Sequence, residues 1–260
     1  MSMKFKTSLL LMMLSISIIN CKNIMNSENK RKSKSYIGTK KPSETKKIGD
    51  LVFTDGSAIG YTPELVLTDN QKENAIAVIF YSSDKSNSSL GAKTLGIGIR
   101  YCSTEIPWCV DKAISYIPEI VCEVSGGERP NYKFTGDIDG SDNWSLIKSK
   151  SPYNLMCYPV FKYAEEYKNK LPNLIGTLYE DGWYIPSLAE LSTVYNQKGK
   201  INLVLNILNE PLLGSTGTHF WTSSQAKAAE SACSIFFFMG DAGVYPKKEG
   251  RRALVIHRFN

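Results

Sequence analysis

The stretch DGWYIPSLAEL at residues 181–191 restricts the fold more than any other part of the sequence. Ser187 and Glu190 stand three positions apart, which is the spacing of a capping box at the start of a helix. Pro186 comes just before this box, and apolar residues recur behind it at helical spacing. The stretch therefore predicts a helix that is capped by Ser187 and buries one apolar face.

The segments on either side of this helix predict an α+β fold. Strands come first, then a long irregular section at residues 123–152, then helices, and then strands again. This order does not alternate as βαβ units would. The irregular section is longer than a connector needs, which is typical of functional or covering loops. The expected strands cover residues 48–53, 75–81, 95–101, 220–222, 233–239 and 253–259, and the two other helices cover residues 158–168 and 201–208.

The first 21 residues are typical of a bacterial lipoprotein. A cationic start, residues 1–6, precedes an apolar run of about a dozen residues, which is too short to span a bilayer and matches a secretory signal. Cys21 follows the run directly, where a lipobox places the acylated cysteine. We therefore expect a signal peptide over residues 1–20, lipidation of Cys21, and a place in the cell envelope, at the outer membrane or cell surface.

The charge is unevenly distributed along the chain. Residues 1–47 hold eleven of the 31 Lys and Arg but two of the 25 Asp and Glu, so residues 48–260 carry 20 basic and 23 acidic side chains, a net charge of −3. Residues 21–47 are polar and basic, which predicts a disordered tether. Residues 48–260 are long enough for one domain with a buried core. Their acidity excludes nucleic acid as a partner.

Cysteine and histidine patterns predict no metal site and no cofactor. His219 and His257 have no ligating companions at metal spacing. Asp137, Asp139 and Asp142 could hold calcium, but a solvated turn is the favoured interpretation. Export permits disulfides, and among the five cysteines after Cys21 the pair expected from proximity is Cys102 with Cys109.

Three C-terminal stretches together resemble a known family. Residues 181–191, then FWTSSQ at 220–225, then RRALVIHRF at 251–259 are similar to the G-W-Y-[LM]-P-S-x-x-E-L … W-[ST]-S-[ST]-Q … R-x-A-V-R-x-F signature of bacterial C-type-lectin-like domains of the formylglycine-generating-enzyme type. That family includes the treponemal variable surface lipoproteins associated with diversity-generating retroelements. The resemblance covers about residues 48–260 and implies a C-type-lectin-like fold, in which two or three helices lie against twisted antiparallel sheets in a single domain.

The resemblance also implies where a ligand binds. In the variable members, ligand-contacting residues lie between the second and third stretches, which here is the window 226–249. Strand alternation and turn placement within this window predict that Cys233, Ile235 and Phe237 point inward. They predict exposed ligand-binding residues at Ala226, Lys227, Glu230, Ser231, Asp241, Tyr245, Lys247, Lys248 and Glu249.

Three functions are compatible with these patterns. The leading hypothesis is a membrane-anchored surface lipoprotein, an adhesin or display receptor, that binds a protein or glycan and is not an enzyme. The first alternative is a cysteine oxidase of the formylglycine-generating kind, which needs a reactive cysteine pair that the sequence does not map. The second alternative is a purely structural envelope lipoprotein.

Overall fold

The computed structural model describes residues 35–214 and 218–259. The predicted signal peptide, the lipidation site Cys21 and the first part of the predicted tether lie outside these residues. From Tyr36 onwards the described residues belong to one compact unit. No helix among them is both long and apolar enough to span a bilayer.

The second half of the predicted tether is part of the folded unit. The backbone of Lys40 exchanges two hydrogen bonds with Ala58, at 2.8 and 2.9 Å, and Gly38 donates its N–H to Ser57 Oγ. The Lys40 side chain forms an ion pair with Asp50. The prediction of a tether up to residue 47 is therefore wrong for residues 36–47. Backbone and side-chain hydrogen bonds order this polar segment, although it buries little apolar surface.

A five-stranded antiparallel sheet forms one half of the core. Its strand order is β12-β4-β3-β1-β2. The apolar run at residues 75–81 lies in β3 and is buried along its whole length, as predicted. The strands are β1 (Leu51–Phe53), β2 (Ala58–Ile59), β3 (Ala75–Ser83), β4 (Lys93–Gly98) and β12 (Ile256–Phe259).

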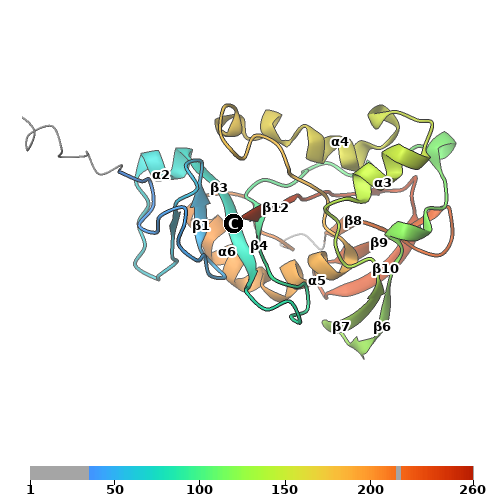
Figure 1. Cartoon of the computed structure of the whole chain (residues 1–260), viewed down its shortest axis with the longest axis horizontal. Coiled ribbons are helices and arrows are strands. Elements are labelled where there is room, and N and C mark those ends of the chain that lie inside the picture. The colour runs from blue at the N-terminus through green and yellow to red at the C-terminus, as the bar shows by residue number, and fades with distance from the viewer. Residues whose placement is uncertain (1–34, 215–217, 260) are drawn as a thin grey trace, which may run out of the picture. The chain divides into compact units, whose positions relative to one another are not determined.

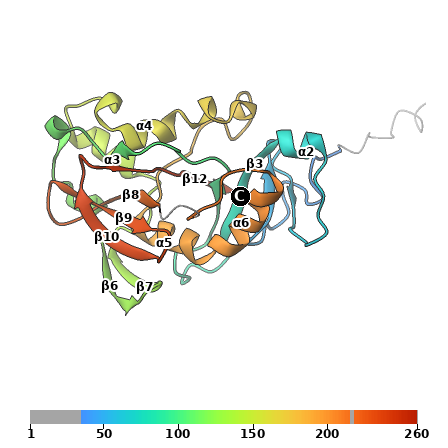
Figure 2. The same ribbon diagram turned by 180° about the vertical axis from the view of Figure 1, so that it is seen from behind.

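A three-stranded antiparallel sheet with the order β10-β9-β8 forms the other half (Figure 2). Its strands are β8 (His219–Gln225), β9 (Ser231–Phe236) and β10 (Asp241–Pro246). The strand predicted over residues 233–239 ends at Phe236, because a turn follows, and β10 is a strand that was not among those expected. Two short pairs complete the strands: β5 (Ile106–Pro107) with β11 (Gly250–Arg251), and β6 (Cys122–Glu128) with β7 (Asn131–Gly136).

The described residues form five α-helices, more than the two or three expected. They are α2 (Asp69–Glu73), α3 (Asn143–Lys150), α4 (Pro159–Glu165), α5 (Leu188–Asn196) and α6 (Lys198–Ile207). In Figure 1, α3 and α4 lie above strands β8 and β9, α5 lies below them, and α6 lies to the left beside the five-stranded sheet, where it contacts β3. Single-turn 3₁₀ helices cover Asp111–Ala113, Pro118–Ile120, Leu155–Cys157, Tyr167–Asn169 and Pro172–Leu174. The α+β prediction is confirmed.

Helix α5 begins as the sequence predicts and joins the two sheets. Ser187 Oγ accepts a hydrogen bond from the N–H of Glu190, and the Glu190 carboxylate accepts one from the N–H of Ser187 at 2.9 Å. The helix contacts β3 of the larger sheet and β8 and β9 of the smaller one. The capping box therefore sets the start of the element that holds both sheets together.

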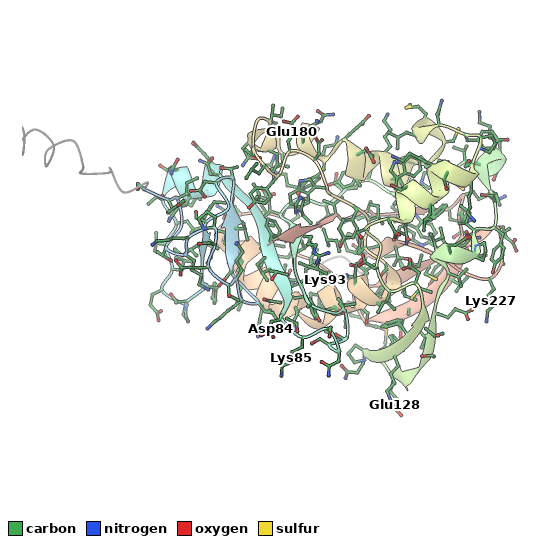
Figure 3. The ribbon with its side chains drawn as sticks, viewed as in Figure 1. Asp84, Lys85, Lys93, Glu128, Glu180 and Lys227 are labelled. Atoms are coloured by element: carbon green, nitrogen blue, oxygen red, sulfur yellow. The ribbon has the colours of Figure 1, made fainter. Side chains whose placement is uncertain are left out.

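Glu190 also anchors a buried ion pair that connects α5 to β4. Its carboxylate lies 3.2 Å from Lys93 Nζ and accepts a hydrogen bond from Tyr184 at 3.0 Å. Lys93 Nζ reaches Asp139 as well, at 2.8 Å. Figure 3 shows Lys93 in the interior of the molecule. Because every charge in this cluster has a partner, it fixes helix, strand and loop in one arrangement.

The section expected to be irregular, residues 123–152, is in large part regular. The hairpin of β6 and β7 occupies its first half, and α3 occupies its second. A register shift between Val124 and Gly126 bends the hairpin. Gly126, Gly127 and Gly136 lie within these two strands and are typical turn formers, so the sequence favoured an irregular interpretation of a hairpin.

Candidate functional site

Most of the predicted ligand-binding residues lie at one end of the three-stranded sheet. Lys227 and Glu230 are exposed in the connection from β8 to β9, and Lys248 and Glu249 are exposed in the turn after β10. The two turns meet because Lys247 donates its N–H to the carbonyl of Glu230 at 2.8 Å. Figure 3 shows Lys227 at the outer edge of the molecule. The partly exposed Ser231 begins β9 at the same end.

Two of the predicted residues are buried, so their prediction as exposed ligand contacts is wrong. Lys247 is 0% exposed: its Nζ donates to the carbonyl of Ser115 at 2.9 Å and lies 4.5 Å from the centre of the Trp108 ring. This burial lowers the pKa of Lys247 to about 8. Ala226 is buried too: its side chain belongs to the hydrophobic core, and its N–H donates to the carbonyl of Ser231 across the β8–β9 connection.

Asp241 and Tyr245 lie on the open side of the sheet, together with aromatic residues that the sequence analysis missed. His219, Phe236 and Asp241 are direct neighbours across the three strands, so their side chains share one face. The His219 ring stacks on Phe236, with centroids 4.6 Å apart, and Tyr245 contacts the edge of His219 at 5.2 Å. These contacts form a continuous aromatic surface.

Arg251 extends this surface beside Tyr245. Its guanidinium carbon lies 4.4 Å from the centre of the Tyr245 ring, within the range of a cation–π contact. It also forms an ion pair with Glu249 at 2.8 Å. Arg251 Nε is buried without a hydrogen-bond partner. We call His219, Phe236, Phe238, Tyr245 and Arg251 the aromatic face.

Gly243 gives the Tyr245 ring its position. A side-chain carbon at Gly243 would come within 2.6 Å of Tyr245 Cε2, closer than real atoms approach. The ring therefore lies flat along the strand, over the place where any other residue would carry a Cβ. With any other residue at this position, the Tyr245 ring would have to move from the place where it contacts His219.

Phe238 is the most exposed member of the face. It is 65% exposed in the turn between β9 and β10, and its ring lies 6.0 Å from that of Phe236. Met239 beside it is 43% exposed. The alternation of buried and exposed side chains could have predicted the positions of Phe236 and Phe238. Ile235 and Phe237 are buried as predicted, and the residue that follows each of them points outward. No comparable local signal identifies His219 or Arg251.

The chemistry of the face is that of recognition. Rings, a guanidinium group and an imidazole offer apolar area and hydrogen-bond donors. Burial, aided by nearby Arg251, lowers the pKa of His219, which favours its neutral imidazole. Tyrosine, tryptophan and arginine dominate the energetics of protein interfaces because they combine large contact area with polar groups.

The cysteines of the described region are free thiols, so the predicted pairing of Cys102 with Cys109 is wrong. Cys109 is buried beside Trp108, and burial raises its pKa to about 11. Burial raises the pKa values of Cys122 and Cys233 to about 12. At neutral pH these thiols are protonated and weakly nucleophilic.

Metal-binding groups are sparse in the described region. Residues 35–214 and 218–259 contain no group of three or more His, Cys, Asp or Glu side chains that could hold a metal ion. Within the aspartate run, Asp139 is engaged by Lys93. The sequence-based prediction of no metal site and no cofactor stays a prediction.

Comparison with known proteins gives a match at the level of fold. No protein-family model and no curated protein matches the chain. A solved structure of a fimbrial protein from Bacteroides ovatus is similar in fold, with a TM-score of 0.51 and 15% sequence identity. The match covers 81% of this chain and 48% of the fimbrial protein, so the chain spans about half the length of that structure.

Proposed function

We propose that this chain is a surface lipoprotein that binds a protein or glycan through the aromatic face. The observation that carries the proposal is a set of solvent-accessible rings on a hydrogen-bonded sheet, with Phe238 65% exposed at its edge. Large exposed apolar side chains that are clustered mark interaction sites more often than single ones do. Strands β8, β9 and β10 hold His219, Phe236 and Tyr245 in place before binding, which favours affinity.

The comparisons and the sequence support a surface protein. The similar structure is described as a fimbrial protein, which is a bacterial surface protein. The three C-terminal stretches resemble C-type-lectin-like domains, and the mixed α+β fold with antiparallel sheets is compatible with that family. We therefore propose a C-type-lectin-like fold for residues 48–260, with the ordered segment 36–47 packed against it.

A lipid on Cys21 would hold the protein on the cell envelope. We expect an alkyne-tagged fatty acid to label the wild-type chain in growing cells. We also expect the wild-type chain to enter the detergent phase in a phase-partitioning experiment. Cys21→Ser abolishes both, because a single cysteine carries the acyl chains. Cys102→Ser, which replaces a half-exposed thiol of the folded unit, is the matched control and keeps the label. Persistence of the label in Cys21→Ser would contradict the anchor.

Binding is a better proposal than catalysis for this chain. The oxidase alternative needs a reactive cysteine pair, and the raised pKa values of Cys109, Cys122 and Cys233 favour unreactive thiols. The net charge of −3 for residues 48–260 supports a partner other than nucleic acid.

The test is a binding screen of the full chain on arrays of extracellular-matrix proteins, bacterial envelope proteins and glycans. Tyr245→Ser and Phe238→Ser are compared with Leu178→Ser, which also removes an exposed apolar side chain, 93% exposed, but lies outside the face. We expect each face variant to lose about tenfold or more in affinity for the ligand found, as interface anchors do. Leu178→Ser should bind like the wild type.

Two outcomes of this screen would contradict the proposal. If the face variants bind as the wild type does, the ligand site lies elsewhere. If no array component binds the wild type, the structural-lipoprotein alternative is favoured. Circular dichroism of each variant establishes that a loss of binding does not reflect unfolding.

A further inference from the structure

A cavity of about 210 Å³ lies between α3, α4 and the segment that precedes α5, and it shares no residue with the aromatic face. Pockets that hold drug-sized molecules are about 300–1,000 Å³, so this one suits a single side chain or a group of similar size. The residues that matter for its chemistry are Trp144, Phe161, Glu165, Glu180, Asp181 and Tyr184.

Aromatic rings form the wall of the cavity. Trp144 stacks on Phe161 with centroids 5.3 Å apart and planes 20° apart. Phe161 is buried, so the half-buried rings of Trp144 and Tyr184 supply the accessible aromatic surface. Lys148 already places its Nζ 5.4 Å from the centre of the Trp144 ring. Aromatic faces attract cations, tryptophan most strongly.

Carboxylates form the rim. Glu180 and Asp181 share the ammonium group of Lys168, at 2.8 and 3.0 Å, which shows that this rim accommodates a cation. Glu165 is exposed and forms no ion pair within the part of the chain that the structure describes. Three carboxylates, the ammonium group of Lys168 and that of Lys148 over Trp144 leave the mouth of the cavity with a net charge of −1. Figure 3 shows Glu180 at the upper edge of the molecule, far from Glu128 at the lower edge.

We propose that this cavity binds one positively charged side chain, an alkylammonium or guanidinium group, from a partner protein. The aromatic wall would receive the aliphatic stem and the face of the cation, and Glu165 would supply the carboxylate that lacks a partner. A charge-assisted hydrogen bond to a carboxylate is about twice as strong as a neutral one. The net negative rim disfavours acidic groups, and it gives a neutral sugar no charge to pair with.

The experiment uses the full chain labelled with 5-fluorotryptophan and followed by ¹⁹F NMR. The chain has four tryptophans. Trp144 and Trp183 line the cavity, whereas Trp108 and Trp221 do not and serve as internal references. Butylguanidinium and butylammonium chloride are titrated, with butylurea as the neutral isostere and methyl glucoside as the sugar probe. We expect saturable shifts of the two cavity resonances with the cations alone, and weaker binding at high salt.

Two variants test the assignment. Glu165→Gln removes the unpaired carboxylate and should weaken binding of both cations about five- to tenfold, whereas Glu128→Gln, an exposed glutamate of the β6–β7 hairpin, should leave it unchanged. Ser145→Leu fills the cavity from the exposed side of α3 without a change of charge and should abolish the shifts.

Several results would overturn the proposal. They are no saturable shift with either cation, equal shifts with butylurea, binding of methyl glucoside in place of the cations, or unaltered affinity in Glu165→Gln. None of these results bears on the aromatic face, since the two sites have no residue in common.

Discussion

The two main sheets differ in how completely they are covered. In the five-stranded sheet, β3 is buried from Ala75 to Tyr81. In the three-stranded sheet, β10 is exposed or partly exposed at each of its six residues, although β9 beside it is largely buried. A strand buried on both faces stabilises the fold and has no surface to offer. The accessible edge strand β10, with the partly exposed His219 and Phe236 beside it, can bind a partner without giving up the packing of the sheet on α5.

The strongest test of this difference compares two phenylalanines. Phe80 in β3 is 0% exposed and Phe238 is 65% exposed. We expect Phe80→Ala to lower the free energy of unfolding by about 3–5 kcal/mol, because it removes buried area and leaves a cavity. Phe238→Ala should lower it by less than about 1 kcal/mol, as surface substitutions do. Denaturant unfolding of the two variants measures both values, and equal losses would show that the second sheet is no more open than the first.

Two neighbouring lysines test which side chains are buried at the end of the three-stranded sheet. Lys247 is buried and Lys248 is exposed. The folded pKa of about 8 lies below the usual 10.5, so between these values the unfolded chain binds more protons than the folded one. Stability therefore rises with pH in this window. From about pH 7 to pH 9.5 the wild type should gain about 2 kcal/mol relative to Lys247→Met.

The control for this measurement is Lys248→Met. Its stability difference from the wild type should stay constant over the same pH range. Because buried cysteines and tyrosines also titrate at high pH, the differences between proteins are informative and the absolute stabilities are not. A flat difference for Lys247→Met would mean that the lysine is solvated and that the buried end of the sheet is incorrectly described.

The smallest expected effect concerns the position of Tyr245. Gly243→Ala places a Cβ within 2.6 Å of the Tyr245 ring and should displace the ring from His219. We expect a loss of about 1 kcal/mol in ligand binding, about fivefold, with little change in stability. Gly126→Ala, in strand β6, is the matched control because no atom lies within 4 Å of its added carbon. Equal binding of both variants to the array ligand would show that Tyr245 does not need its observed position.

Local sequence signals predicted much of the frame. The capping box at Ser187 and Glu190 and the buried run at residues 75–81 depend on neighbours in sequence, and both are confirmed. The hairpin of β6 and β7 was missed because Gly126 and Gly127 read as turns, whereas its strands pair with each other across a bulge.

The site was harder to predict because it depends on contacts between distant parts of the chain. Lys247 is buried by Trp108 and Ser115, which lie more than 130 residues away in sequence. The position of Tyr245 depends on the ring of His219 in another strand. The periodicity of the window 226–249 indicates which residues alternate, but it cannot show which face of the sheet the rest of the fold leaves open.

The most direct test of the central claim is hydrogen exchange of the full chain with and without the ligand found on the arrays. If the aromatic face binds, protection should increase in β9, β10 and the turn between them, and around His219 and Arg251. Exchange in β3 and β4 should stay the same. Protection that appears in the five-stranded sheet, with β9 and β10 unchanged, would contradict the account.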